Sequence, residues 1–192
     1  MKSRRGTLVT LALLLAASWP LAAKTVEEKA QDAQEARAKI DRMAQEKLDE
    51  VLTAKPKAAD LFDQAYGYAV FDNTKLSLGL TGGAGGKGVA VERASGKRTY
   101  MKMKSGSLGL GLGAATYNVV LLFQDERTFR DFVEGRWAAA ASAGAVAGTA
   151  GAAAGDAFVH GVAAYALSGK GLMARADVSG TKFSKNKKLN QD

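Results

Sequence analysis

The sequence predicts an α+β domain: a curved, mainly antiparallel, glycine-rich β-sheet with an N-terminal helical segment and one amphipathic helix packed on it. Three observations lead to this fold class. The segment Lys24–Ala54 has neither Gly nor Pro and is rich in strong helix formers. All but one of the 22 glycines lie between Gly67 and Gly180, where short runs alternate apolar and polar residues. Asp125–Glu134 interrupts that alternation with an apolar stripe at helical spacing.

The first 23 residues have the features of a signal peptide. Lys2, Arg4 and Arg5 precede a short apolar run, Leu8–Ala17, which is too short to span a bilayer comfortably. We therefore expect cleavage near Ala23 and export of the remaining chain to the bacterial periplasm or out of the cell. A retained N-terminal anchor is the alternative.

The composition excludes several kinds of site. The chain has no cysteine, which rules out disulfides, thiolate nucleophiles, thiolate-bound zinc and lipid attachment to an N-terminal Cys. The one histidine, His160, has apolar neighbours that favour a structural role over a catalytic one. We predict no enzyme, metal site or cofactor. The formal charge of +8, which falls to +5 because the signal segment holds three cations and no acid, suits an anionic surface without indicating nucleic acid.

The N-terminal helix is predicted over residues 24–55. Its apolar stripe is mostly alanine at first and thickens toward Leu52, so the first half should project and the second half should pack on the domain. Pro56 ends this helix and begins a short second one that reaches Gln64. A contact between Lys24–Ala54 and an envelope protein is the alternative hypothesis, under which the chain is a structural or interaction module of the periplasm.

The sheet is predicted as a meander of short strands, because turn residues recur between alternating segments. The predicted strands are 66–71, 75–80, 88–93, 97–104, 107–114 and 117–123, with 158–167 and 171–179 after the amphipathic helix. The predicted breaks are Asp72–Asn73, Gly82–Gly86, Ser95–Gly96 and Ser105–Gly106. Residues 183–192 are expected to form a basic, flexible tail.

The glycine-rich stretch resembles a nucleotide loop only superficially. Gly83–Gly88 matches G-x-G-x-x-G, but a strand pattern follows where a helix N-terminus would have to hold the pyrophosphate. A P-loop fails as well, because Thr81 stands where Gly is required and Gly88 where Ser or Thr would hold magnesium. We predict a wide turn with positive φ values and a close backbone approach. Its amides near Lys87 are a candidate headgroup site.

The strand 97–104 carries the most distinctive predicted surface. Three cations and one aromatic ring share one face of it, and Thr99, Met101 and Met103 lie on the other. The first face suits a phosphate-rich interface; the alternative is a solvated outer face that protects the sheet from edge pairing. The candidate lipid-binding residues are Lys87, Arg98, Tyr100, Lys102, Lys104 and Lys170.

Residues 137–155 are low in complexity, and the part from Ala138 to Ala154 contains no charged residue. Two G-x-x-x-G patterns, Gly144–Gly148 and Gly151–Gly155, would allow close helix packing in a bilayer. Alanine and glycine are only weakly driven into lipid, so we expect small-residue strands or a loop packed on the body instead.

Four parts of the chain resemble the SYLF domain in their order and spacing. They are Ala65–Phe71, Gly82–Val89, Gly109–Gly113 with Asn118–Phe123, and Tyr165–Leu172. The resemblance covers about Pro56 to Lys182, so we expect a SYLF-like domain over 56–182. Eukaryotic members of this family bind phosphoinositide membranes and regulate actin, and exported bacterial members are lipid-binding proteins, often lipoproteins. The resemblance implies non-catalytic binding of anionic phospholipid or phosphoinositide-like headgroups. The missing Cys implies a form without a lipid anchor, and the actin role does not carry over to an exported protein.

Overall fold

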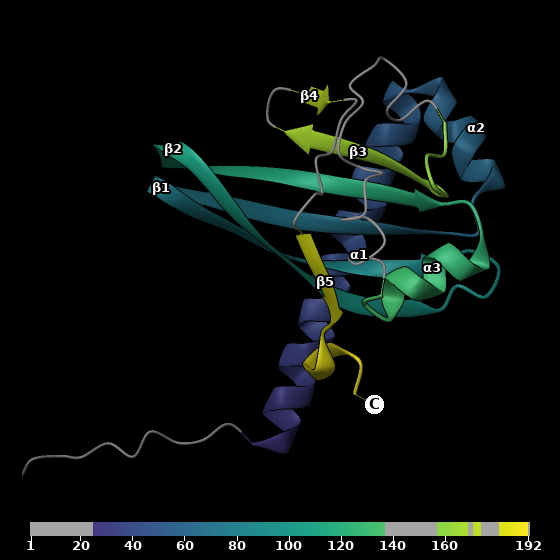
Figure 1. Cartoon of the computed structure of the whole chain (residues 1–192). Helices are drawn as coiled ribbons and strands as arrows, with labels where there is room; N and C mark the ends of the chain where they lie inside the picture. The colour runs from purple at the N-terminus through teal and green to yellow at the C-terminus, as the bar shows by residue number, and fades with distance from the viewer. Residues whose placement is uncertain (1–24, 137–156, 169–170, 174–180, 192) are drawn as a thin grey trace, which may run out of the picture.

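The computed structural model of the chain describes residues 25–136, 157–168, 171–173 and 181–191, with the strand segments 75–82 and 105–115 described as backbone (Figure 1). It is an α+β fold, as predicted. The helices are α1 (Val26–Ala54), α2 (Pro56–Gln64), α3 (Glu126–Val133) and the short 3₁₀ helix η1 (Lys187–Leu189). The strands are β1 (Gly67–Glu92), β2 (Arg98–Phe123), β3 (Val162–Ser168), β4 (Gly171–Met173) and β5 (Thr181–Lys185).

Helix α1 begins at a capping box. The Thr25 hydroxyl accepts a hydrogen bond from the Glu28 amide, and the Glu28 carboxylate accepts one from the Thr25 amide. The buried residues of α1 lie in its second half, whereas Val26 is 81% exposed. They are Ile40, Ala44, Leu48 and Val51. This confirms that the first half projects and the second half packs on the domain (Figure 1).

Strands β1 and β2 form one long antiparallel hairpin. They pair from Gly67 opposite Phe123 to Val91 opposite Arg98, and the turn between them contains Gly96 with φ of 68°. The prediction of several short strands is therefore wrong. Breaks were predicted at Asp72–Asn73, Gly82–Gly86 and Ser105–Gly106, but each of these residues has a partner across the ladder. Cross-strand pairing along the whole hairpin outweighs the local turn preference of these residues.

The hairpin curves back over itself, so that two halves of β1 touch (Figure 1). A Cβ added to Gly86 would lie 2.1 Å from the Asp72 carbonyl oxygen, and one added to Gly88 would lie 2.1 Å from the Val70 carbonyl oxygen. The predicted close backbone approach is thus confirmed. The predicted positive φ values are not found there, since the glycines with positive φ in the described part of the chain are at 96, 135 and 161.

The other strands widen the sheet beside the two halves of β2. Its second half pairs with β3, which pairs with β4, and its first half pairs with β5. The structure therefore differs from the predicted flexible tail at 183–192. Phe183 is buried and lies opposite Met103, so burial of one aromatic side chain and a strand ladder fix this segment despite its lysines. The candidate Lys170 and the stretch 137–155 lie outside the described residues.

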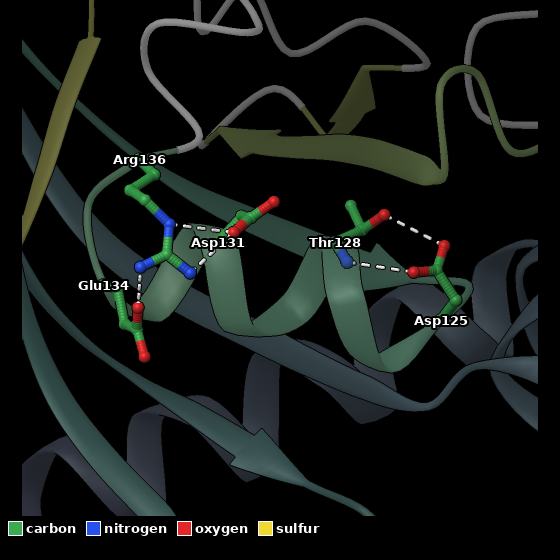
Figure 2. A network of polar contacts seen from close by, with 5 residues as sticks. All are labelled: Asp125, Thr128, Asp131, Glu134 and Arg136. Atoms are coloured by element: carbon green, nitrogen blue, oxygen red, sulfur yellow. Dashed lines mark hydrogen bonds and ion pairs between the residues drawn. The ribbon is translucent and has the colours of Figure 1, made fainter.

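Helix α3 packs by its two phenylalanines, Phe129 and Phe132, and presents charged residues outward. Figure 2 shows the polar contacts that close its ends. The Asp125 carboxylate accepts hydrogen bonds from the Thr128 amide and hydroxyl, both at 2.9 Å, and Arg136 pairs with Asp131 and Glu134 after the last turn. The predicted amphipathic helix at 125–134 is confirmed.

The hairpin separates two hydrophobic cores. One lies against α1 and α2 and is mostly aliphatic, with Tyr100 and Tyr165. The other lies against α3 and contains five phenylalanines whose ring centroids are 4.7–6.1 Å apart in contacting pairs. These are Phe71, Phe123, Phe129, Phe132 and Phe183. We call the two sides the α1 face and the α3 face.

Candidate functional site

The alternation predicted for the start of β2 is present in the structure. Tyr100 belongs to the core on the α1 face, and Met101 and Met103 belong to the core on the α3 face. Arg98, Lys102 and Lys104 follow the period of Tyr100, so all four predicted residues point toward the side of α1. The four residues form two pairs that differ in their surroundings: Arg98 and Tyr100 contact α1 directly, and Lys102 and Lys104 line a hollow beside it.

Arg98 and Tyr100 fasten α1 to the sheet. The Tyr100 hydroxyl donates a hydrogen bond of 2.9 Å to the Asp41 carboxylate, and the Arg98 Nε lies 3.5 Å from the same group. Tyr100 is 8% exposed, whereas the sequence interpretation placed it on an open surface. Burial, and then the bond to Asp41, raises the pKa of the Tyr100 hydroxyl to about 12. Both side chains therefore have a structural role in this conformation.

The end of the chain reinforces the same junction. The Asn190 side chain accepts a hydrogen bond from the Tyr100 amide and donates one to the Tyr100 carbonyl, at 2.9 and 2.7 Å. Arg37 of α1 donates to the carbonyl oxygens of Leu189 and Gln191, at 2.8 and 2.6 Å. Asn190 thus completes the ladder where β5 has ended, and Arg37 ties α1 to it.

The other predicted lysines gather beside this junction. Lys87 lies directly opposite Lys102 in the hairpin, and Lys104 lies directly opposite Lys182 of β5. Directly opposed residues of antiparallel strands have Cβ atoms about 4.5–5.5 Å apart, and like charges in that position are destabilising. Lys39 of α1 lines the same hollow as three of them. We call Lys39, Lys87, Lys102, Lys104 and Lys182 the lysine cluster.

The lysine cluster keeps a net positive charge. Within the described residues, none of its members forms an ion pair, and four are exposed while Lys102 is half-buried. Arg98, by contrast, has Asp41. The structure thus brings together three of the six predicted residues, Lys87, Lys102 and Lys104. Arg98 and Tyr100 differ from them because both contact Asp41 of α1.

A groove of about 530 Å³ runs between α1 and the hairpin beside the lysine cluster. We call it the α1 groove. Its α1 wall is Ala36, Lys39, Ile40 and Met43, and its hairpin wall is Asp72, Thr74, Gly85, Gly86, Lys87, Lys102, Met103 and Lys104. Asp72 is the one acid among these residues, against four lysines. The arrangement offers an apolar strip with cations at its rim, which suits an anionic amphiphilic ligand.

A larger hollow, of about 670 Å³, lies where α3 and η1 approach the first residues of β2. Its walls carry acids as well as cations. Glu92 there already accepts hydrogen bonds from the hydroxyls of Tyr66 and Ser95, and Arg130 pairs with Glu126 at 2.5 Å. Three of its five cations already have partners, since Arg37 donates to backbone carbonyls, Arg98 pairs with Asp41 and Arg130 pairs with Glu126. This hollow therefore offers fewer unpaired cations to an anionic ligand than the α1 groove does.

Two further kinds of site were searched for in the described part of the chain. It contains no group of three or more metal-ligating side chains, and none of its helices is long and apolar enough to cross a membrane. His160 is exposed in a turn, with φ of 49°, between the bridged residues Val159 and Val162.

Two members of the lysine cluster, Lys39 and Lys182, were not among the candidate residues predicted from the sequence. Lys39 follows Ala36 by three positions and precedes Met43 by four, so helical periodicity places it at the border of the apolar stripe. That signal was available in the sequence. Lys182 could be found only from the pairing of β5 with β2, which is a long-range contact.

One protein-family model matches the second half of this chain, from β2 to the end. Residues 104–192 match the family model described as Ysc84, Las17-binding protein actin regulator. In this region the chain belongs to the Ysc84 (SYLF) family. The SYLF match begins inside β2 and continues past Lys182 through β5 and η1, in agreement with the structural role of that segment. The family predicted from sequence is thereby confirmed, although the matched residues begin at 104 and not at the predicted Pro56.

A curated relative supports the assignment. Beta cell expansion factor A of Aeromonas veronii is 43% identical over 159 residues, which are 83% of this chain and 60% of the relative. The chain spans about three fifths of the length of that relative. Membership in the SYLF family supports a lipid-binding or protein-interaction module at the level of the family.

Proposed function

We propose that this SYLF protein binds anionic phospholipid surfaces of the bacterial envelope, without catalysis, through the lysine cluster. The observation that carries the proposal is the direct opposition of Lys87 to Lys102 and of Lys104 to Lys182, none of which forms an ion pair within the described residues. Such pairs lower the stability of the free protein, and an anionic ligand relieves the repulsion. Lipid phosphates arranged in a plane supply that charge.

The geometry of the cluster supports a surface as its partner. The lysines belong to three adjacent strands and to α1, so their ammonium groups spread over one side of the molecule rather than converging on one atom. Lysine acts as a flexible, hydrated point charge and suits headgroups at varied positions. Each lysine close to an anionic membrane contributes about 1 kcal/mol to binding at low ionic strength.

The site of action follows from the predicted signal segment. We propose that residues 1–23 direct export and that cleavage near Ala23 leaves the chain in the periplasm or outside the cell. Mass spectrometry of the protein from the producing cells measures this directly. A mass that still includes residues 1–23 would contradict the proposed cleavage.

Vesicle binding tests the function. We expect the protein to co-float with vesicles that contain phosphatidylglycerol and to stay unbound with neutral phosphatidylcholine vesicles. Replacing Lys87, Lys102 and Lys104 together by Gln should weaken binding on the order of a hundredfold. The matched control replaces Lys57, Lys97 and Arg127 by Gln, which removes the same charge from exposed positions on α2, the hairpin turn and α3. Equal loss in both variants would contradict the assigned site.

A further inference from the structure

We propose that the α1 groove holds the acyl chain of a single anionic lipid whose charged head lies at the lysine cluster. This rests on the proposed function and adds to it a defined ligand: one lipid molecule bound by both of its parts. Three features of the groove lead to this inference, and they concern its α1 wall, its hairpin wall and its charge.

The α1 wall has an apolar strip beside Lys39. Ala36, Ile40 and Met43 are spaced by four and three residues, so they lie above one another on one side of the helix. Met43 is half-buried, and its unbranched thioether side chain adapts to irregular shapes. A strip of this kind lies alongside an extended hydrocarbon chain without requiring a particular orientation of it.

Two glycines, Gly85 and Gly86, line the hairpin wall, and only Gly85 lies on the strand face that carries the lysines. Glycine occupies these two positions for different reasons. A Cβ at Gly86 would lie 2.1 Å from the Asp72 carbonyl oxygen, so close packing of the backbone requires glycine there. At Gly85 the nearest atom to an added Cβ is the Met103 carbonyl oxygen at 4.0 Å, and no positive φ applies. Packing therefore gives no reason for glycine at 85, where its effect is to keep the groove open.

The charged residues of the groove are mostly lysines, with Asp72 as the one acid. Gly85 lies opposite Lys104, and Lys87 lies opposite Lys102, so the open position at Gly85 and the lysines share one face of the hairpin. A volume of about 530 Å³ falls within the range of about 300–1,000 Å³ typical of small-molecule sites. An apolar strip next to unpaired cations complements a hydrocarbon chain that ends in a phosphate.

Binding of alkyl monophosphates of increasing chain length tests the proposal. Each is kept below its critical micelle concentration, inorganic phosphate is the chainless member, and affinity is measured by titration calorimetry on the full chain. We expect the affinity to rise about fourfold for each methylene that enters the groove and then to level off. An affinity that does not depend on chain length would overturn the proposal.

A groove-filling variant locates the chain. Gly85→Leu should abolish the gain with chain length, because its side chain enters open space in the groove, while the lysines and their charge remain. Gly85→Ala, with a smaller side chain, should shorten the range of lengths that gain affinity. Thr53→Leu, at an exposed position of α1 outside the groove, is the control and should behave as wild type. A chain-length dependence that survives in Gly85→Leu would overturn the assignment to this groove.

The two proposals fail in different ways. Vesicle binding that requires Lys87, Lys102 and Lys104, together with no dependence on chain length, would overturn the acyl-chain site and leave the proposed function in place. Vesicle binding that is unchanged in the triple Gln variant would overturn the proposed function itself.

Discussion

The two faces of the β1/β2 hairpin are covered in different ways. On the α3 face, Phe123 and Phe132 are fully buried within a group of five contacting phenylalanines. On the α1 face, the helix is held by aliphatic contacts and by a polar junction at Asp41, Tyr100 and Arg98, and an open groove lies beside it. The same two strands thus form a closed core on one side and an accessible, basic surface on the other.

This difference separates stability from binding. A dense aromatic core stabilises the bend of the hairpin without offering a site, since its rings leave no room for a ligand. The α1 face includes features that lower stability, namely like-charged pairs at Lys87–Lys102 and Lys104–Lys182. Such locally unfavourable choices concentrate where a protein binds something.

The largest expected effect on stability is on the α3 face. Phe132→Ala should lower the free energy of unfolding by about 3–5 kcal/mol, because Phe132 is fully buried against Phe71, Phe123 and Phe183. Urea denaturation measures the loss. The folded fraction should still bind vesicles as wild type does. A loss below about 1 kcal/mol would show that this core is not close-packed as described.

The next effect distinguishes two adjacent glycines. Gly86→Ala should cost about 1–3 kcal/mol, since its Cβ meets the Asp72 carbonyl oxygen at 2.1 Å and the crossing halves of β1 must separate. Gly85→Ala is the matched control. It should be neutral or stabilising by up to about 1 kcal/mol, because the added methyl enters open space and stiffens the unfolded chain. Equal denaturation midpoints for the two variants would contradict the crossing of the hairpin.

A smaller effect concerns the junction of α1. Tyr100→Phe should lower stability by about 0.5–1.5 kcal/mol at neutral pH through loss of the hydrogen bond to Asp41. The pKa of Tyr100 is about 12 in the folded state against 10.0 for the unperturbed group. The raised pKa means that the contribution of Tyr100 is fully present below about pH 10 and is lost as pH rises through about 12.

Denaturation curves across this alkaline range check the sign. Wild type should lose stability between pH 10 and 12 more steeply than Tyr100→Phe, which has no phenol to ionise. Parallel curves for the two proteins would contradict the burial of the Tyr100 hydroxyl against Asp41.

The fold class and the helices could be predicted from sequence because their signals are local. A stretch without Gly or Pro predicts α1, Pro56 marks its end, and Asp125 marks the cap of α3. The strand boundaries could not be predicted in the same way. Asn73 and Gly86 are turn residues by local preference, yet both lie inside β1, because pairing with β2 and the crossing of the hairpin determine their conformation.

The candidate site was predicted only in part, because only some of its features depend on local sequence. Alternation along one strand correctly placed Lys102 and Lys104 on one face. It could not show that α1 covers Tyr100 on that face, nor that Lys182 reaches it from the end of the chain. Both facts depend on contacts between residues far apart in the sequence, which periodicity does not encode.

The smallest expected effect on stability accompanies the largest effect on binding. Replacing Lys87, Lys102 and Lys104 by Gln removes a directly opposed like-charge pair and one member of another. The free energy of unfolding should therefore stay the same or rise by about 0.2–1 kcal/mol. A clear loss of stability, measured by urea denaturation in low salt, would mean that these lysines are structural.

The central claim is that the lysine cluster on the α1 face serves the binding of an anionic lipid and not the stability of the fold. Equilibrium binding to vesicles with increasing phosphatidylglycerol content, measured for the triple Gln variant of Lys87, Lys102 and Lys104 beside the matched variant of Lys57, Lys97 and Arg127, tests it most directly. The account predicts a loss on the order of a hundredfold for the first and wild-type binding for the second. Wild-type binding by the first variant would contradict it.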